Sequence, residues 1–512
     1  MYFLPIALII VSTLSLIITF FSIKIKKNAI ETVNDMGIGW NLGSTFESRG
    51  DPEKIKTPDD QITLDGNPIP TKKMISRMKK YGFKTIRFPV TWYHFMDDKG
   101  NVNPEWMSRV KEVVTWIIKE KMYCILNVHH DGEAGKWLRK GLEVKDRYIY
   151  LWKQISNEFK NFNEYLIFES MNDVTYTTIE GKFDYIVLLT LTQSFVDVVR
   201  NSGGKNSDRL LLISGAEKDI ELTCTSEYKL PIDPSKKLAV TLVYNLPKQF
   251  AIEPEDNPWT YIDNNNEIQI VPTQTVWGNE NDYKDMFTQF ETMKEVYTSK
   301  GIPVVIVEVH VITEQKKEKA SIRRYLFTEF SMSNSYEGIM SCLWDTSGHG
   351  SMNHYNRETD KWYDEGIRDN FIKISEGKEI KPRDFFVFTN TETVRTPNIE
   401  NNMRIFIGVK KVLKVIFNAM ISTKNLTEVS FLVVSNDINS KRAEISVPAK
   451  NGERKYDGSY SFTVDVSHND NNDFMQIEKE SGKEYITFNY FTCEFAQSHT
   501  FFDYNEYIKV IS

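Results

Sequence analysis

The chain has 512 residues, which is enough for two or three domains, and one of these could be a β/α barrel of roughly 250 to 400 residues. Hydrophobic residues make up 41% and charged residues 26% of the chain, as in ordinary globular proteins, and the net charge of −7 argues against a nucleic-acid partner. Aromatic residues make up 13%, which suits flat ligand faces such as those of sugar rings, although most of these side chains are expected in the core.

The N-terminal segment, residues 1–27, is predicted to be a signal peptide or a membrane anchor. Tyr2 to Ile23 carries no charged side chain and is about as long as a membrane span. No small-x-small cleavage site follows cleanly, and Lys24, Lys26 and Lys27 come directly after the apolar run, which slightly favours a retained anchor. The positive-inside rule would place the rest of the chain in the cytoplasm.

Strand-like and helix-like segments follow in alternation. A glycine-punctuated segment at 36–45 predicts a first strand and its loop, and 82–90 predicts a second strand that carries Arg87 and is stopped by Pro89. From Pro104 onward, apolar residues recur at helical spacing, which predicts a helix that faces the core.

The same unit repeats along the chain. Further strands are predicted at 123–128, 165–173, 210–213, 238–243, 304–307 and 339–343. Strands alternating with helices over roughly 350 residues predict a parallel α/β architecture, and polar residues at so many strand ends favour a closed (β/α)8 TIM barrel over residues 28–388.

The segment 165–173 is the first candidate for the chemistry, because its apolar run ends in Asn172 and Asp173. A parallel β/α barrel presents catalytic groups at the carboxyl ends of its strands. Taken alone, the pair could equally start a turn after a buried strand. The Asn/Pro-rich segment between Phe250 and Trp277 is likewise open to two interpretations, a wall beside the site or an excursion without structure.

The alternation stops past residue 385. Residues 389–402 read as a polar linker, and 403–512 contain short runs of period-two pattern separated by turn residues, which predicts a β-sandwich domain. Its aromatic residues could form a carbohydrate-binding platform, but sandwich core is the safer interpretation. The acidic loop 469–473 lacks the spaced ligands of a known calcium loop.

The predicted strand ends bring together a set of polar and aromatic residues. They are Arg87, His129, His130, Asn172, Asp173, Glu308 and Trp344. No phosphate loop and no His/Cys cluster with zinc spacing is present, so no metal and no cofactor is expected. Neighbours in a strand point to opposite faces, so one histidine of the adjacent pair is expected in the site and the other in the core. Two carboxylates with an Arg, a His and a Trp suit glycoside cleavage, which needs an acid for the leaving oxygen and a carboxylate on the other side.

Six motifs, in this order along the chain, resemble glycoside hydrolase family 5 of the cellulase type. They are Gly39-Trp40-Asn41-Leu42-Gly43, Thr85-Ile86-Arg87-Phe88-Pro89-Val90-Thr91-Trp92, Asn127-Val128-His129-His130-Asp131, Phe168-Glu169-Ser170-Met171-Asn172, Ile302-Pro303-Val304-Val305-Ile306-Val307-Glu308 and Trp344-Asp345. The resemblance covers about residues 30 to 385. It implies a (β/α)8 barrel that acts with retention on β-linked glucans, mannans or xyloglucans.

The resemblance also implies roles for the site residues. Glu308 would be the nucleophile, Arg87 and Asn172 would position it and the sugar 2-hydroxyl, and Trp344 would form the floor. Either His129 or His130 would line the site. Asn41 and Tyr244 are further candidates for substrate binding, and Asp173 occupies the position of the acid/base.

The chain departs from the family pattern at several of these positions. The family acid/base is a Glu, whereas this chain has Asp173, and Val243-Tyr244-Asn245 stands where the family has His-x-Tyr. Val307 and His310 replace glycines on either side of the nucleophile.

The magnitudes leave the activity open. Shortening Glu to Asp withdraws the proton donor by ~1.5 Å, and misplacement on that scale can cost on the order of 10²-fold in rate. General acid catalysis as a whole is worth ~10² to 10⁴-fold. The sequence therefore predicts a protein that binds a β-linked polysaccharide of glucan type, with weak or lost endo-β-1,4-glucanase activity. A non-catalytic glycan-binding pseudoenzyme and a structural scaffold are the alternatives. Work on a polysaccharide favours entry into the secretory route, with the barrel outside the cytoplasm and the N-terminal segment acting as a signal peptide or as a membrane anchor.

Overall fold

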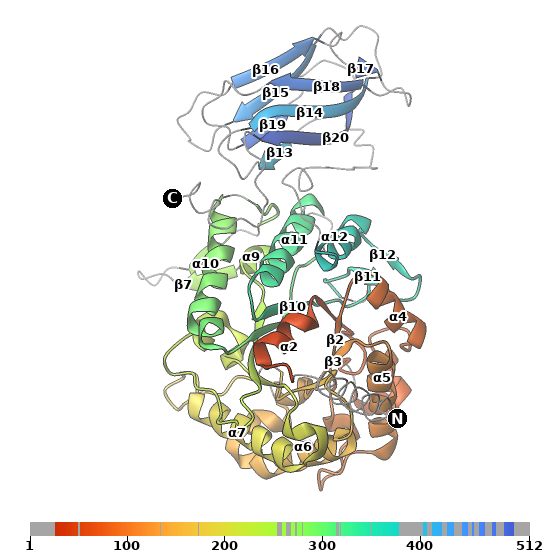
Figure 1. Ribbon diagram of the computed structural model, residues 1–512, viewed down its shortest axis with the longest axis vertical. Helices are drawn as coiled ribbons and strands as arrows, with labels where there is room; N and C mark the ends of the chain where they lie inside the picture. Colours follow the sequence, from red (N-terminus) through yellow and green to blue (C-terminus); the bar gives the residue numbers. More distant parts are fainter. Residues whose placement is uncertain are drawn as a thin grey trace, which may run out of the picture.

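A computed structural model of the chain (Figure 1) shows a closed barrel followed by a set of β-strands. It describes residues 26–49, 52–133, 135–172, 174–252, 259–262, 268–271, 274–278, 280–313, 317, 319–348 and 350–377, and eight strands beyond residue 400. The apolar N-terminal run and Asp173 lie outside the described residues. Within these ranges, no helix has the length and apolar character needed to cross a membrane.

Eight parallel strands close the barrel, which confirms the predicted fold of this domain. In chain order they are β1 Gly39–Asn41, β2 Thr85–Phe88, β3 Tyr123–Asn127, β4 Leu166–Glu169, β5 Leu211–Ser214, β6 Leu238–Tyr244, β9 Val304–Val309 and β10 Ile339–Leu343. Around the barrel their order is β1-β10-β9-β6-β5-β4-β3-β2. Every neighbouring pair is parallel, so all carboxyl ends open at the same end of the barrel.

Helices precede, connect and follow these strands; the first of them packs against the core inside the barrel, and the others lie around it (Figure 1). The helices are α2 Ala29–Met36, α3 Pro58–Thr63, α4 Lys72–Lys80, α5 Pro104–Lys119, α6 Lys145–Phe159, α7 Tyr185–Asn201, α8 Ile220–Thr223, α9 Lys248–Ala251, α10 Glu280–Val296, α11 Lys319–Ser335 and α12 Glu365–Ser375. Helix α5 confirms the core-facing helix predicted from Pro104 onward. Asn103 caps the helix, Pro104 occupies its first turn, and the side chains of Trp106, Val110 and Val114 are buried.

The side chains of each strand alternate between two cores. One core lies inside the barrel and contains Ile125, Ile167 and Val305, with Val33 and Met36 of α2 packed against them. The other lies between the strands and the surrounding helices. Because both faces of the strands are buried, both faces are apolar, as is typical of parallel sheets. At the carboxyl ends, this alternation decides which polar side chains enter the barrel.

Strand β9 contains a bulge next to Glu308. Leu242 of β6 pairs with Ile306, but the next residue, Val243, pairs with Glu308, so β9 carries one extra residue. The pairing of β9 with β10 shifts at the same place. Since Val305 and Val307 already face the interior, Glu308 would face outward in a regular strand. The bulge turns Glu308 into line with Val243 and so into the barrel.

The segment between β6 and α10 contains an antiparallel pair, β7 Trp259–Ile262 and β8 Ile268–Val271. After β10, a short antiparallel pair is formed by β11 Tyr355–Asn356 and β12 Lys361–Trp362.

Beyond residue 400 the described strands form two four-stranded antiparallel sheets. One has the order β13 Met403–Phe406, β19 Phe474–Ile477, β15 Glu428–Val434 and β16 Ala443–Pro448, and the other has the order β17 Glu453–Arg454, β18 Tyr460–Asp465, β14 Val412–Ile421 and β20 Ile486–Phe495. Strands are thus present where the period-two pattern predicts them, whereas the β-sandwich remains a prediction.

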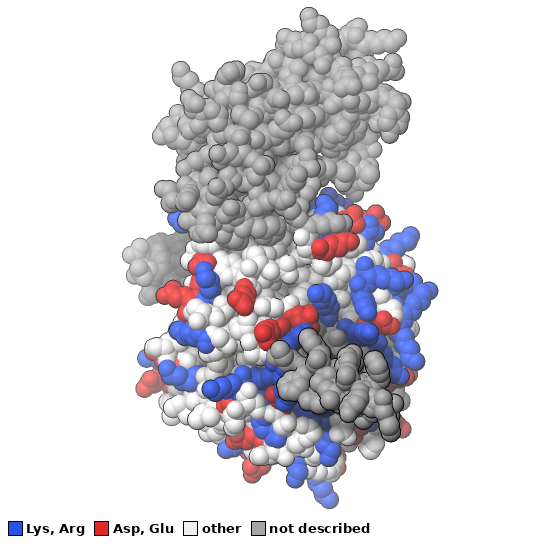
Figure 2. All heavy atoms as spheres, viewed as in Figure 1, with Lys and Arg blue, Asp and Glu red and all other residues white. Residues whose placement is uncertain are grey.

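Figure 2 shows one face of the molecule, on which Lys and Arg side chains are interspersed with Asp and Glu side chains over the part of the surface that is described.

Candidate active site

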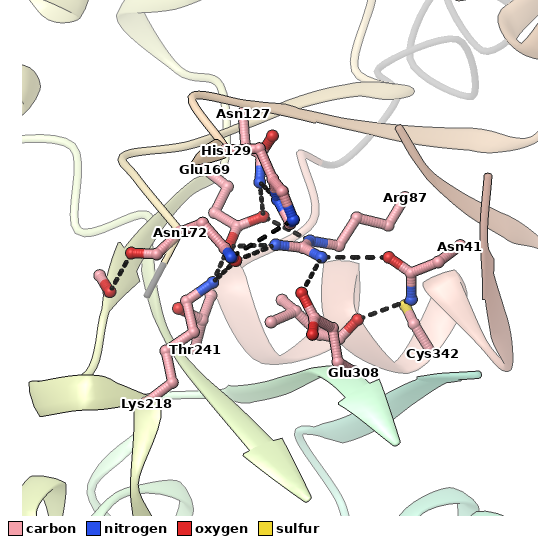
Figure 3. Close-up of polar contacts among 12 residues, drawn as sticks. Asn41, Arg87, Asn127, His129, Glu169, Asn172, Lys218, Thr241, Glu308 and Cys342 are labelled. Carbon is pink, nitrogen blue, oxygen red and sulfur yellow. Dashed lines mark hydrogen bonds and ion pairs between the residues drawn. The ribbon is translucent and has the colours of Figure 1, made fainter. Parts of the chain in front are cut away.

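Arg87 at the end of β2 is the centre of a buried network of polar side chains (Figure 3). Its Nε and Nη2 bind the two oxygens of Glu169 at 2.6 and 3.0 Å, and its Nη1 binds Glu308 Oε1 at 2.7 Å. The remaining two N–H groups reach Asn41 Oδ1 at 3.1 Å and Asn172 Oδ1 at 2.8 Å. All five guanidinium donors are therefore used, and one side chain fixes four partners from different strands and loops.

Glu308 is held at both of its oxygens. Arg87 binds Oε1, and His310 Nε2 lies 2.8 Å from Oε2. Burial raises the pKa of Glu308, but Arg87 and His310 outweigh that effect and hold the pKa well below its usual range. The Glu308 carboxylate is thus ionised and fixed in orientation. The Asn41 amide donates to the backbone carbonyl of Val307 at 2.8 Å and so supports the bulge.

A second carboxylate, Glu169, lies on the other side of the guanidinium. It is fully buried and pairs with both Arg87 and Lys218. Burial raises the pKa of Glu169, and the two cations more than offset this, so that the net pKa is lowered. Burial also lowers the pKa of Lys218, and the Glu169 charge opposes that shift. Two buried cations therefore face two buried carboxylates in this network.

The Asn172 amide has a defined orientation. Its Oδ1 accepts hydrogen bonds from Arg87 Nη2 at 2.8 Å and from Lys218 Nζ at 3.0 Å. Its Nδ2 lies on the opposite side, 3.4 Å from His129 Nε2. Asn127 Oδ1 accepts from the backbone N–H of Val90, so the Asn127 Nδ2 lies on the side of His129, 3.2 Å from its Nδ1.

The two adjacent histidines both lie beyond the end of β3, which closes at Asn127. Their rings are 4.4 Å apart, so they do not point to opposite faces as neighbours in a strand would. Burial lowers the pKa of His129 well below its usual value and that of His130 to about 3, so both rings are neutral. The Trp344 ring stacks on His129, with centroids 5.8 Å apart and an angle of 6° between the planes.

The structure brings most of the predicted site residues together. Direct hydrogen bonds join Asn41, Arg87, Asn172 and Glu308, and ring contacts add His129, His130 and Trp344. Asp173 lies outside the described residues, so its separation from Glu308 remains a prediction.

Tyr244 lies elsewhere, contrary to its prediction as a substrate-binding residue. Its side chain packs in the core between the strands and the helices, and its hydroxyl donates to Gln289 Oε1 of α10 at 2.6 Å. The physical reason is the alternation along β6: Val243 faces the barrel interior, so Tyr244 faces away from it.

Four residues of the network were not singled out as candidates from the sequence. They are Asn127, Glu169, Lys218 and His310. Asn127 and Glu169 carry a recognisable signal, because each is a polar residue that ends an otherwise apolar strand. His310 follows Glu308 by two residues, but its contact depends on the chain path after β9. Lys218 follows β5 in a loop, and nothing in its sequence context marks it.

The chemistry that this arrangement allows follows from its charges. It offers an ionised carboxylate with fixed geometry, an amide group, and an aromatic surface formed by Trp344 and His129 at the mouth of the barrel. Among the described residues, no group of three or more His, Cys, Asp or Glu side chains could hold a metal ion.

Comparison with known proteins assigns the family. The sequence profile of the cellulase family, glycosyl hydrolase family 5, matches residues 46–350. The chain belongs to glycoside hydrolase family 5. It is 30% identical over 364 residues to Endoglucanase A of Clostridium longisporum, an alignment that covers 68% of this chain and 66% of that protein, so this chain spans just under two thirds of that relative.

Solved structures of family 5 proteins are similar to this chain. A GH5-4 broad specificity endoglucanase from an uncultured bovine rumen ciliate is 58% identical, with a TM-score of 0.66 over 69% of this chain and 99% of that one. A family 5 lichenase mutant from Caldicellulosiruptor sp. F32, solved with cellotetraose, is 28% identical, with a TM-score of 0.61 over 68% of this chain and 96% of that one.

Residues of β6 and of the segment after β9 surround Glu308. Val243 lies directly opposite Glu308 in the pairing of β6 with β9 and presents an apolar side chain there. His310 supplies a hydrogen bond to Glu308 from the other direction, along the chain after β9. The backbone N–H of His310 donates to the Tyr244 carbonyl at 2.9 Å, which fixes this segment against the end of β6.

Proposed function

We propose that this chain binds a β-linked glucan at the carboxyl end of its barrel and hydrolyses it slowly with retention of configuration. Glu308 is the nucleophile, and Asp173 stands in the acid/base position. The observation that carries the proposal is the state of Glu308, which is ionised, bound at both oxygens and aimed into the barrel by the bulge in β9. The endoglucanases and the cellotetraose-bound lichenase among its relatives support a glucan as the ligand.

The mechanism follows from this geometry. In the first step, a Glu308 oxygen attacks the anomeric carbon, the glycosidic bond breaks, and an acid protonates the leaving oxygen. Because Arg87 and His310 hold the carboxylate ionised and in one orientation, little reorganisation is needed before attack. In the second step, water cleaves the glycosyl-enzyme ester, and the acid acts as the base.

Substrate placement is assigned to the groups beside Glu308. The Trp344 ring, stacked on His129, offers a flat surface for a sugar ring. The Asn172 NH2 is oriented away from Arg87 and Lys218, and we assign it to the 2-hydroxyl of the sugar that reacts. Hydrogen bonds to this hydroxyl strengthen in the transition state and contribute to the rate in retaining enzymes.

Protonation of the leaving group is the weak step. Asp173 is one methylene shorter than Glu, and Val243 offers no hydrogen bond opposite Glu308. These replacements favour a second candidate function, in which the chain binds glucan without cleaving it. A barrel that serves only as a scaffold would neither bind nor cleave.

One set of assays separates these functions. Binding and cleavage of cello-, manno- and xyloglucan-oligosaccharides are measured with the wild type, with Glu308→Gln and with Asp173→Glu. Slow hydrolysis is expected, with the β-anomer as the first product by NMR, and it should disappear in Glu308→Gln. Binding without turnover in the wild type, together with cleavage gained in Asp173→Glu, would establish the non-catalytic alternative. Absence of glucan binding would refute both.

A combined variant tests whether the β6 replacements limit activity as well. Asp173→Glu, Val243→His and Asn245→Tyr together introduce the side chains of the family pattern. Since position 243 pairs with Glu308, a His there lies beside the nucleophile. Cleavage that exceeds that of Asp173→Glu alone is the expected result.

We further propose that residues 403–512 form a β-sandwich that could bind carbohydrate, and that the N-terminal segment directs the barrel out of the cytoplasm. The two antiparallel sheets support the first proposal. The uncharged run from Tyr2 to Ile23 supports the second. Cell fractionation with protease protection of the full chain tests the second proposal, and glucan pull-down with a chain truncated after residue 388 tests the first.

A further inference from the structure

Lys218, in the loop after β5, is a buried cation that has no role in the proposed mechanism. Its side chain has no exposed surface, and its ammonium contacts Glu169 and Asn172 Oδ1 (Figure 3). A buried ammonium is unfavourable unless it is paired and hydrogen-bonded. The contacts of Lys218 meet that requirement, and both of its partners also bind Arg87, which holds Glu308.

The backbone that delivers Lys218 is itself unfavourable. Glu217 and Lys218 have φ values of +49° and +50°, in the left-handed region that residues with a Cβ rarely adopt. Two such residues in succession mean that the surrounding structure enforces this conformation, and strain of this kind clusters at functional sites. The fold thus accepts both strain and a buried charge at one residue.

The first consequence of Lys218 is electrostatic. Arg87 bridges Glu169 and Glu308, so without Lys218 two buried carboxylates would share one cation. With Lys218 on Glu169, each carboxylate has a cation of its own. Lys218 therefore leaves the charge of Arg87 available to Glu308.

The second consequence concerns the Asn172 amide. Arg87 and Lys218 both donate to its Oδ1, which sets the NH2 on the opposite side. That NH2 lies 3.4 Å from His129 Nε2. An amide NH2 has two hydrogens, so one can face the His129 ring while the other is directed to an acceptor on a ligand.

We propose that Lys218 is a positioning residue for glycoside cleavage. It neutralises Glu169 and, together with Arg87, orients Asn172 so that its NH2 donates to the 2-hydroxyl of the reacting sugar. This inference rests on the proposed function of the same site. Lys218 acts through Asn172 and Glu169 and does not itself touch the sugar.

The first test compares two substrates. Lys218→Met removes the ammonium and keeps the length of the side chain, and the variant is assayed on an aryl β-cellobioside and on its 2-deoxy analogue at the reacting sugar. We expect kcat/KM to fall on the order of 10- to 100-fold for the 2-hydroxy substrate, as for loss of a charge-assisted hydrogen bond, and to fall much less for the 2-deoxy substrate. Equal fractional losses on both substrates would overturn the proposal, because a merely structural defect does not distinguish them.

A matched control is available on the same barrel. Lys236 also has a left-handed backbone, with φ of +51°, but its side chain is exposed and it precedes β6 at the other end of the barrel. Lys236→Met should leave both rates unchanged. If Lys236→Met lowered kcat/KM as much as Lys218→Met does, the loss would not depend on the contacts of Lys218 with Glu169 and Asn172. The assignment would then be overturned.

The second test needs no sugar. In Lys218→Met the Glu169 carboxylate loses its own cation, so the melting temperature at neutral pH should fall by several degrees. The double variant Lys218→Met/Glu169→Gln removes both charges and should melt above the single variant. If the double variant melts lower still, Lys218 does not neutralise Glu169 and the proposal is wrong. Absence of glucan binding by the wild type would refute the proposed function, and the melting comparison would still decide the charge pairing.

Discussion

The contact between His310 and Glu308 leads to a prediction about the pH dependence of hydrolysis. His310→Ala removes the group 2.8 Å from Glu308 Oε2, whereas His310→Gln keeps a side-chain N–H of similar reach. Glu308 must be ionised to attack, and its pKa is held low by Arg87 and His310. Without His310 the pKa of Glu308 rises, so activity is lost at a higher pH as the medium is acidified.

The size of the shift follows from the contact. A hydrogen bond to a charged group is worth ~1.5 to 3 kcal/mol, and one pKa unit corresponds to ~1.4 kcal/mol, which gives about 1 to 2 units. The His310 side chain is 18% exposed, so solvent competes for the contact and the lower end applies. We expect the acid limb of kcat/KM to move up by about one pH unit in His310→Ala and to stay near the wild-type position in His310→Gln.

The assay is the pH profile of kcat/KM on an aryl β-cellobioside. The activated leaving group of this substrate needs little help from an acid, so Asp173 does not mask the ionisation of Glu308. The kcat/KM profile reports ionisations of the free enzyme, which is the state that the structure describes. An acid limb that does not move in His310→Ala would refute the reasoning, because the carboxylate would then be held by Arg87 alone.

Three further predictions concern other residues of the site. Asp173→Glu should raise kcat/KM on natural cello-oligosaccharides by about 10- to 100-fold and change it little on aryl cellobiosides, because the gain is in protonation of the leaving oxygen; equal gains on both substrates would contradict this. Arg87→Met should lower the free energy of unfolding by ~3 to 5 kcal/mol in urea titrations, since it leaves two buried carboxylates with one cation, and a loss below ~1 kcal/mol would contradict it. In the wild type, the lowered pKa values of Glu169 and Glu308 give stability that is present at neutral pH and is lost as the pH falls below the usual Glu range, so the unfolding free energy should decline there with a shallower slope in Glu308→Gln.

The pattern of apolar residues in the sequence predicts the strands and helices of the barrel well, because each of these elements is marked by residues that lie close together in the chain. Each strand is a short buried run, each helix has a period near 3.6, and caps such as Asn103 with Pro104 mark a helix start within a few residues. Polar residues at the strand ends then indicate which end of the barrel carries the site, and Arg87, Asn172 and Glu308 do meet there.

The orientation of residues at a strand end was not predictable in the same way. Because β6 is buried on both faces, Val243 and Tyr244 are both apolar or aromatic, and the pattern does not say which of them faces the interior. In β9 one extra residue reverses the parity at Glu308, and nothing in the run of valines marks the bulge.

The sequence by itself determined the (β/α)8 architecture and the family, because periodicity and short motifs depend only on neighbouring residues. Only the tertiary structure decided the charge network, since it joins residues far apart in the chain: Lys218 reaches Glu169 across 49 positions, and Arg87 reaches Glu308 across 221. Such contacts exist only once the barrel closes and brings its strand ends to one mouth. The partners of a buried charge are therefore set by closure of the sheet, whereas the strands that carry the charge are set by local pattern.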